Sequence, residues 1–531
     1  MILTIGAIGS DCLNAQTISD SKWYDFDFIR QSDIRLTAEN PALLSTLPNI
    51  RISTAQISFV KNNGELINYY QSPDSYTMDV QTASFFRVHD QLVLYGLVNY
   101  QQFNGKKMGG SAFINPNIMP FNIVEATDTT RGTKQKESYH IVGGIAYNVA
   151  KKITIGAQLD YMAVNYVKRK DLRHKNKMLD LTTTAGINYK INRKTELGGN
   201  IFLQKRVEGV YFNIYGTSDK RHVSLIDYGT FFGRTETFTE LGDGYTSGKQ
   251  ERPLVSNVYG GAVQLQLNLS QKIKIFNHFY IRNETGYYGE KSSYSIVHTE
   301  YKAYMAGYQS GIQLHSHKNT HRFDINIDTK TLNNFKNIYT IENAPGEMSY
   351  VKYHDKNKML HHSQQKIALE YLGNIGISGY HARWMLNGSV TLTHRDRQTS
   401  LYPFFRKQNL TYWDSYLSVR KNFFRQTDCI GLSFAINYGA GNGNPYTDGT
   451  YTNPSDTEIP PKTTPSNLYT EHDYFISPHY GIEPNFLYSM KLKNNKIATV
   501  SLKYNYTKSF ETVSKVNSYR QQLMFSFRYD F

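Results

Sequence analysis

Apolar and polar side chains alternate along most of the chain with a period of two residues. Between 153 and 161, one set is Ile153, Ile155, Ala157, Leu159 and Tyr161, and the interleaved set is Thr154, Gly156, Gln158 and Asp160. The segments 263–269, 323–328 and 498–506 show the same division. Successive side chains of a β-strand point to opposite faces. The pattern therefore predicts many strands, each with one apolar and one polar face.

The last nine residues alternate most clearly. Leu523, Phe525, Phe527, Tyr529 and Phe531 share one face, and Met524, Ser526, Arg528 and Asp530 share the other. An aromatic final strand of this kind is typical of an outer-membrane barrel, whose outer face meets lipid while its inner face meets water. We predict that Phe525, Phe527, Tyr529 and Phe531 form an assembly signal for the barrel-assembly machinery.

Short and long connections between the predicted strands alternate. The short ones, at 148–152, 192–194, 270–272, 317–320 and 494–496, are assigned to the periplasm, and the long ones, at about 103–136, 208–256, 332–362 and 440–481, to the cell surface. This sorting of loops by side is expected of an outer-membrane barrel. The predicted fold is all-β, a transmembrane antiparallel barrel of about 14 to 18 strands with long extracellular loops.

Composition excludes the helical class of membrane protein. The mean hydropathy is −0.52, and no apolar run reaches the ~18 residues that a spanning helix needs. A chain of 531 residues usually forms several soluble domains, but a barrel absorbs this length as repeated hairpins. We therefore expect one barrel domain, over 50–531, in the outer membrane of a Gram-negative bacterium.

The N-terminal region divides into two expected parts. Residues 1–15 resemble the end of a truncated export signal, with an apolar stretch from Ile2 to Ile8 and cleavage after Ala15. Asp11 disfavours lipidation of Cys12, and cleavage would leave Cys429 without a disulfide partner. Residues 16–49 lack clear alternation, and we expect them to form a plug or a periplasmic segment.

Two resemblances bear on function. The stretch Glu39-Asn40-Pro41-Ala42-Leu43 resembles the N-terminal Asn-Pro-Ala stretch of the fatty-acid-channel family of outer-membrane barrels. The Ala15-Gln16 cleavage style, the richness in Tyr and Asn and the terminal aromatic strand resemble large outer-membrane barrels of Bacteroidota. The second resemblance implies no established catalytic residues. It also implies a nutrient-uptake accessory to a TonB-dependent receptor or a surface lipoprotein.

The formal net charge of +15 raises the question of nucleic acid. The basic residues are scattered through turns and loops, as in Lys168-Arg169-Lys170, and form no recognised nucleic-acid module. We therefore expect no nucleic-acid partner. Positive loops would instead attract anionic polysaccharide, lipid headgroups or an anionic solute.

Histidines are the candidate metal ligands. His354, His361 and His362 lie in the expected surface loop, and His315, His317 and His321 surround an expected periplasmic turn. Neither group has the spacing of a strong metal motif. We favour the interpretation of both groups as polar turn and interface residues over metal ligands, and we expect no cofactor.

No enzyme motif emerges from the sequence. The run from Gly439 to Pro445 lacks the Lys-Ser or Lys-Thr and the following helix of a phosphate loop. The predicted function is passage or capture of a solute, without catalysis, by a porin-like barrel embedded in outer-membrane lipid. The alternative is a structural barrel that docks lipoproteins, a TonB-dependent receptor or a secretion complex.

Overall fold

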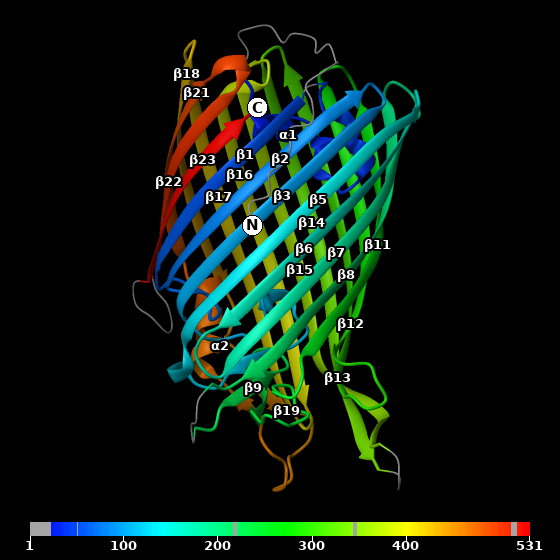
Figure 1. Ribbon diagram of the computed structural model, residues 1–531, viewed down its shortest axis with the longest axis vertical. Helices are drawn as coiled ribbons and strands as arrows, with labels where there is room; N and C mark the ends of the chain where they lie inside the picture. The colour runs from blue at the N-terminus through cyan, green and yellow to red at the C-terminus, as the bar shows by residue number, and fades with distance from the viewer. Residues whose placement is uncertain (1–22, 50, 216–219, 344–347, 511–517) are drawn as a thin grey trace.

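The computed structural model describes residues 23–49, 51–215, 220–343, 348–510 and 518–531. Within these ranges, eighteen long antiparallel strands form a closed barrel, which confirms the predicted fold (Figure 1). The last strand pairs with the first, with Ile57 opposite Phe527 and Ser58 opposite Ser526. The barrel strands are β1 (Arg51–Gly64), β2 (Asp74–His89), β3 (Leu92–Met108), β5 (Gly132–Ala150), β6 (Ile153–Lys168), β7 (Arg173–Lys190), β8 (Thr195–Asn213), β11 (Arg252–Asn268), β12 (Ile273–Gly289), β13 (Val297–Ser316), β14 (Asn319–Glu342), β15 (Tyr350–Ser378), β16 (His381–Leu401), β17 (Phe404–Phe424), β18 (Asp428–Asn442), β21 (His479–Lys491), β22 (Ile497–Ser509) and β23 (Tyr519–Asp530).

The two faces of the barrel differ in polarity, as the alternation predicted. On β8, Ile201 and Leu203 point outward and are 67% and 66% exposed, whereas the interleaved Phe202 is buried. On β6, Ile155 and Leu159 are exposed on the outside, and Asp160 bonds His140 of β5 on the inside. Because the barrel is closed, each of its strands pairs with a neighbour on both sides, and the backbone polar groups are satisfied within the wall. The apolar outer side chains suit contact with lipid.

The two ends of the barrel differ in their connections, and the predicted short turns are confirmed. β5 ends at Ala150 and β6 begins at Ile153, and the predicted turns at 192–194, 270–272, 317–320 and 494–496 also join barrel strands at this end. The last of them contains the 3-10 turn η5 (Lys493–Asn495).

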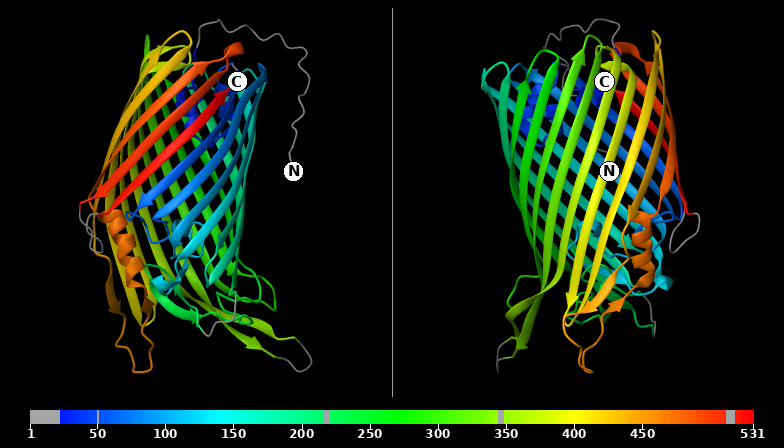
Figure 2. Two further views of the ribbon diagram at one scale, coloured as in Figure 1. Left: turned by 60° about the vertical axis from the view of Figure 1, so that its left-hand side comes forward. Right: turned by 180° about the vertical axis from the view of Figure 1, so that it is seen from behind.

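The longest connections lie at the opposite end and carry further elements. They contain η3 (Pro116–Ile118), β4 (Asn122–Glu125), η4 (Asp128–Thr130), β9 (Val223–Asp227), β10 (Phe232–Thr237), β19 (Thr447–Thr450), β20 (Lys462–Thr463) and α2 (Pro465–Ile476). β4, β9, β10 and β20 form a separate four-stranded sheet, and β19 pairs with β17. Figure 2 shows these segments gathered at the end away from the short turns.

The expectation of a loop over 332–362 is wrong. β14 continues to Glu342, β15 begins at Tyr350, and the two strands pair as far as Glu342 opposite Tyr350. Beyond the membrane both faces of this hairpin meet water, so polar residues occupy both faces and the alternation disappears from the sequence.

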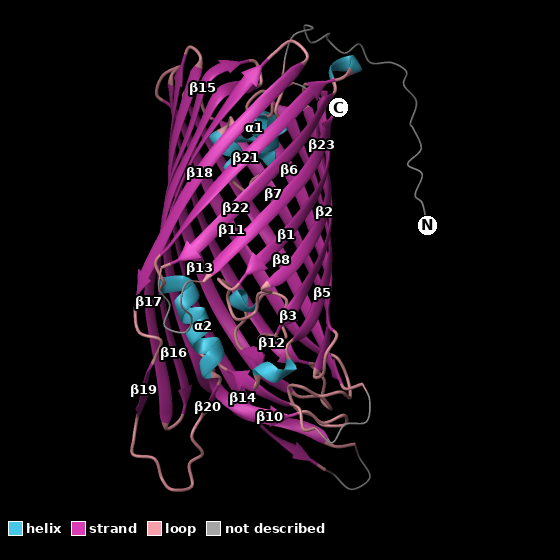
Figure 3. Ribbon diagram, turned by 90° about the vertical axis from the view of Figure 1, so that its left-hand side faces the viewer, coloured by secondary structure: helices cyan, strands magenta, loops and turns pink. Residues whose placement is uncertain are grey.

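Residues 23–49 precede the barrel wall and lie within it. They form α1 (Phe26–Gln31), η1 (Ile34–Thr37) and η2 (Pro41–Thr46), at the end with the short turns (Figure 3). The expected export signal at 1–15 and the first residues of the 16–49 segment lie outside the described residues. No helix in the described part of the chain is long and apolar enough to cross a membrane.

Candidate functional site

The segment 23–49, named here the inner segment, is built from short capped turns. Asp25 caps α1 by accepting hydrogen bonds from the backbone N–H groups of Asp27 and Phe28. Asn40 caps η2 by accepting from the N–H of Ala42, and Pro41 occupies the first position, where no donor is needed. These caps explain why a segment without strand alternation folds into three short helices.

Glycines on the inner wall make room for η2. A Cβ at Gly156 of β6 would overlap the backbone of Pro41 and Ala42, and one at Gly186 of β7 would overlap the side chain of Asn40. The Asn40 amide then donates to the backbone carbonyl of Ile187 and to the Gln264 side chain, at 3.0 and 2.9 Å. This arrangement places the Asn40-Pro41-Ala42 backbone directly against the wall.

Charged pairs join the inner segment to the wall on several sides. Arg528 of β23 lies 3.2 Å from Asp27, and Arg282 of β12 lies 2.6 Å from Glu39. In the opposite sense, Arg35 of the segment lies 3.2 Å from Glu196 of β8. The positive charge thus lies on the wall in some of these pairs and on the inner segment in others.

Asp25 shows how strongly these charges act. Burial would raise the pKa of its carboxyl, but Arg528 and Arg420 more than offset this and lower the pKa below its usual value. The group is therefore ionised at neutral pH, as an ion pair with the wall requires.

Hydrogen bonds to backbone carbonyls of the inner segment extend the contact around the barrel. Wall side chains that donate to backbone carbonyls of the segment include Arg87 of β2, Gln313 of β13 and Arg322 of β14. Apolar contact occurs in three patches. Phe26, Ile29 and Leu47 pack with Phe85 and neighbouring wall residues, Ile34 and Leu43 pack with Phe276, and Trp23 packs with Cys429 and Ile497. The seat of the segment is thus partly polar and partly apolar.

The opposite end of the lumen is filled by the long connections. Phe113, Phe121, Tyr245 and Tyr288 pack edge to face or stacked in one apolar cluster beneath the four-stranded sheet. Because aromatic rings bury large areas, this cluster gives the connections a core of their own.

A buried charge cluster ties α2 to the wall at that end. Glu471 of α2 lies 3.4 Å from Arg395 and 3.2 Å from Arg397, both on β16, and its side chain is only 3% exposed. Burial would raise the Glu471 pKa, but Arg395 and Arg397 lower it. The helix is therefore fixed by an ionised carboxylate shared between two arginines.

A cavity of about 370 Å³ lies against the inner segment. Its lining combines Arg30 and Glu39 of the segment with His140, Gln158 and Asp160 of the wall. Apolar side chains, among them Leu43, Leu47 and Phe85, make up the rest of the lining, so the space is mixed in polarity, with charges of both signs.

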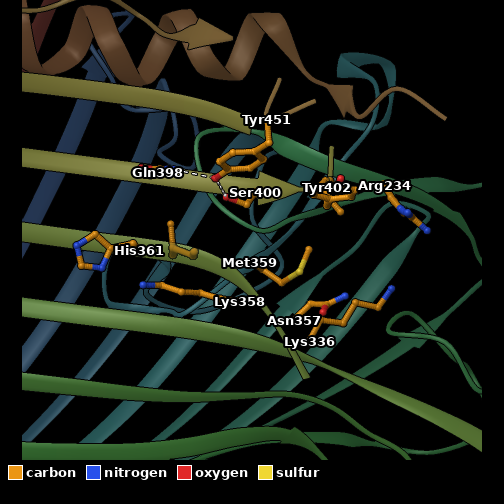
Figure 4. A pocket seen from close by; sticks show the side chains of 12 residues that line it. Arg234, Lys336, Asn357, Lys358, Met359, His361, Gln398, Ser400, Tyr402 and Tyr451 are labelled. Carbon is orange, nitrogen blue, oxygen red and sulfur yellow. Dashed lines mark hydrogen bonds between the residues drawn. The ribbon is translucent and has the colours of Figure 1, made fainter. Parts of the chain in front are cut away.

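A second cavity, of about 640 Å³, lies where β15 and β16 separate. Leu360 opposite Thr399 is the last pair between these strands, and β15 continues to Tyr350 paired with β14 alone. Arg234, Lys336 and Lys358 line this space together with Tyr451, whose hydroxyl bonds Gln398 and Ser400 (Figure 4). We name it the wall notch.

The three histidines proposed as metal ligands do not converge. His361 and His362 are successive residues of β15, so they point to opposite faces; His361 bonds Asn333, and His362 is buried toward the lumen. His354 lies further along the strand and bonds Thr340. Among the described residues, no group of three His, Cys, Asp or Glu side chains could hold a metal ion. His315 and His321 likewise face different sides, and His321 bonds Tyr371 on the outside.

Phe525, Phe527 and Tyr529 of the expected assembly signal lie on β23, and Phe531 directly follows the strand. Phe525, Phe527 and Phe531 face outward and are 42% to 50% exposed, and Tyr529 stacks with Phe531 at 5.6 Å between ring centroids. Their position on the outer face of the closing strand fits contact with lipid. Recognition by the assembly machinery stays a prediction.

Two sets of site residues were missed in the sequence. Of the glycines that seat the inner segment, Gly156 is interpreted from the sequence only as a polar-face position and Gly186 is not interpreted, although glycine inside a strand often marks a close approach of another backbone. Arg234, Lys336 and Lys358 are far apart in the chain, and no sequence signal connects them.

These features define the class of protein: a closed, membrane-spanning β-barrel of the outer-membrane type, with a lumen occupied at both ends. The chain belongs to a family described as a family of unknown function (DUF6850), whose model matches residues 41–531. No curated protein matches the sequence.

Solved barrels match in outline. The ferric preacinetobactin receptor BauA of Acinetobacter baumannii shares 9% identity and a TM-score of 0.41 over 91% of this chain and 80% of that one. The FrpB iron transporter of Neisseria meningitidis (F3-3 variant) shares 8% identity and a TM-score of 0.39 over 93% and 83%. The monoaromatic hydrocarbon channel CymD shares 10% identity and a TM-score of 0.30 over 93% and 91%. These scores carry no argument about substrate or mechanism.

Proposed function

We propose that this protein passes a solute across the outer membrane and that the inner segment is its plug. The observation that carries the proposal is the set of charge pairs between that segment and the wall. The segment also buries apolar side chains such as Phe26 and Leu43. Asp27, Glu39 and Arg35, however, meet the wall through charge pairs on several sides. The Arg282–Glu39 pair is the most open of these, with side chains 26% and 57% exposed, and water can replace an exposed pair at a cost of about 0–1 kcal/mol. The Arg35–Glu196 pair, at 14% and 13%, is more buried and holds the segment more firmly.

The size of the barrel supports the same conclusion. Barrels of about 16 to 18 strands enclose an aqueous channel unless loops or other segments fill it. Here the inner segment occupies one end, and α2 with the four-stranded sheet occupies the other. In the proposed mechanism both closures rearrange, and the solute crosses the polar lumen between them without chemical change.

Conductance in planar bilayers tests this proposal. The full-length protein and a variant that lacks residues 23–46 would be recorded side by side, each with and without Glu471→Gln, which loosens α2. We expect rare openings in the full-length protein, steady channels in the shortened variant, and larger ones in the combination. Silence in all four forms would reject passage through the lumen.

A second function, docking, is favoured by the edge of β15. Between Tyr350 and Lys358 this strand pairs only with β14, which leaves a free edge beyond the membrane. Free edges can add a strand from another chain. We propose a TonB-dependent receptor or a surface lipoprotein as the partner, consistent with an accessory role in nutrient uptake. Lys352→Pro or Lys356→Pro, either of which would break the edge, should then abolish co-purification of the partner and leave conductance unchanged.

A further inference from the structure

We infer that the wall notch binds an anionic saccharide, one that carries sulfate or carboxylate groups. Its role as the solute to be passed depends on the proposed function, but its binding does not. The argument rests on the charges, the free donors and the aromatic rings that meet in this cavity.

The charges in the notch are of one sign. Arg234 comes from β10 of the four-stranded sheet, Lys336 from β14 and Lys358 from β15, so three separate elements bring cations to one cavity of about 640 Å³. No carboxylate lines it. In Figure 4, Arg234 and Lys336 lie at one end of the cavity, and the Lys358 side chain extends toward His361 at the other end.

These cations also lack partners. Among the described residues, neither Arg234, Lys336 nor Lys358 forms an ion pair or a hydrogen bond through its side chain. Glu236, two residues along β10 from Arg234, is occupied, because it accepts from the N–H groups of Tyr245 and Thr246 at 3.0 and 2.7 Å. The Glu236 carboxylate also acts on Lys336 at longer range. Three cations near one carboxylate still leave an excess of positive charge around this space, which favours an anionic occupant.

Neighbouring lysines on the same hairpin behave differently. Lys356, two residues from Lys358, pairs with Glu300 at 3.3 Å, and Lys352 pairs with Glu342 at 3.0 Å. Lys356 belongs to an adjacent cavity that contains Glu300 and Asp355. The absence of counter-charges is therefore a property of the notch and not of the whole hairpin.

The remaining lining suits a sugar more than a simple ion. Tyr402 and Tyr451 are 68% and 50% exposed, with nearly parallel rings whose centroids lie 6.4 Å apart. The Tyr451 hydroxyl is held by Gln398 and Ser400 at 2.9 and 2.8 Å, which fixes the ring beside the cavity. A rigid aromatic face with amides and hydroxyls around it can contact both the apolar face and the hydroxyls of a sugar.

The test measures binding to the full chain in detergent, freed of lipopolysaccharide. The probes are a sulfated tetrasaccharide, the uncharged tetrasaccharide of the same backbone, and sodium sulfate, each titrated by calorimetry. The key variant is the triple substitution Arg234→Gln, Lys336→Gln and Lys358→Gln, and Lys356→Gln is its matched control. The shift in electrophoretic mobility on heating verifies that each variant is folded.

We expect saturable binding of the sulfated tetrasaccharide, weakened at least roughly tenfold in the triple variant and less than about twofold in Lys356→Gln. Tyr451→Ala should weaken the saccharide further than Tyr451→Phe and leave sulfate unchanged. Equal loss in the triple variant and in Lys356→Gln would reduce the effect to general surface charge and overturn the site.

Two further outcomes separate this inference from others. Binding of lipopolysaccharide vesicles without binding of the soluble tetrasaccharide would assign the notch to lipid headgroups and overturn the inference. If the saccharide fails to bind while the variant lacking residues 23–46 conducts, the saccharide site is rejected and the proposed passage stands.

Discussion

Arg528 of β23 lies 3.2 Å from Asp27 of α1, so the strand that closes the barrel also holds the segment inside it. The same guanidinium lies 3.9 Å from Asp25 and 3.2 Å from Asp530. The Arg528 side chain therefore both belongs to the strand that closes the wall and takes part in the seat of the inner segment. A signal that moved β23 or its neighbours would act on the plug directly.

Replacing Arg528 by Gln should free the inner segment. The substitution removes the cation that faces Asp25 and Asp27 but leaves Arg420 near Asp25, so the segment should loosen and the barrel should still close. We expect channel openings in planar bilayers to become several times more frequent. Lys503→Gln is the control, because Lys503 pairs with Glu483 on the wall at 2.7 Å and contacts no residue of the inner segment described here. Equal opening in both variants would contradict the role of Arg528.

Gly156→Leu should displace η2 by direct overlap. The new side chain would occupy the space of the Pro41 and Ala42 backbone, and overpacking of this kind typically costs about 1–3 kcal/mol. Limited proteolysis of residues 23–46 should therefore become faster. Gly143→Leu is the matched control, since a Cβ there meets nothing within 4 Å on the outer face. If both variants resist protease like the unmodified protein, the seat does not hold the segment.

The wall was predictable because it repeats. Alternation in segments such as 153–161 and 498–506 reports a local property of each strand, and the short turns between strands follow from the same pattern. The alternation does not predict the end of the β14–β15 hairpin, because successive residues there, such as His354 and Asp355, are exposed on both faces of the strand. Helix α2 was read as loop, although Pro465 stands at its first turn, where proline is favoured.

The candidate site was not predictable in the same way. Asn40 bonds Gln264 across 224 residues, a contact that exists only once the barrel has closed. The cations of the wall notch likewise belong to β10, β14 and β15, whose proximity depends on how a surface connection folds back. The closeness of His361 and His362 in the sequence does not bring them together as ligands, because the side chains of successive strand residues point to opposite faces.

Glu471→Gln should release α2 at the surface end. The change leaves Arg395 and Arg397 buried without their shared carboxylate, and breaking a buried ion pair costs about 3–5 kcal/mol. Amide hydrogen exchange over 465–476 should accelerate by at least about tenfold, with the rest of the barrel unchanged. Glu458→Gln in the exposed part of the same connection should have no effect. Unchanged exchange in Glu471→Gln would show that other contacts hold the helix.

Asp227 should make the four-stranded sheet more stable in mild acid. Burial raises the pKa of its carboxyl to about 6, and the charge of Glu471 acts in the same direction. Hydrogen bonds from the N–H groups of Gly229 and Phe232 and the charge of Arg397 lower the pKa but do not offset burial. The folded pKa exceeds the ordinary value of 3.8, so the folded sheet takes up a proton that the unfolded segment does not. Stability from this group therefore increases as pH falls from about 6 toward 4, by at most about 3 kcal/mol.

Asp227→Asn isolates this effect because it keeps the shape and one acceptor oxygen. The N–H groups of Gly229 and Phe232 both donate to the same oxygen of Asp227, at 2.8 and 3.1 Å, and the amide oxygen of Asn can accept both. At pH 7, where the charged carboxylate is costly, the variant should exchange amides over 223–237 more slowly than the parent protein. At pH 4 the two should converge, because protonation gives the parent the same neutral group. The control is Asp243→Asn, in the following connection, which should leave the exchange rates over 223–237 unchanged at both pH values. Faster exchange in Asp227→Asn at pH 7 would mean that the carboxylate charge stabilises the sheet.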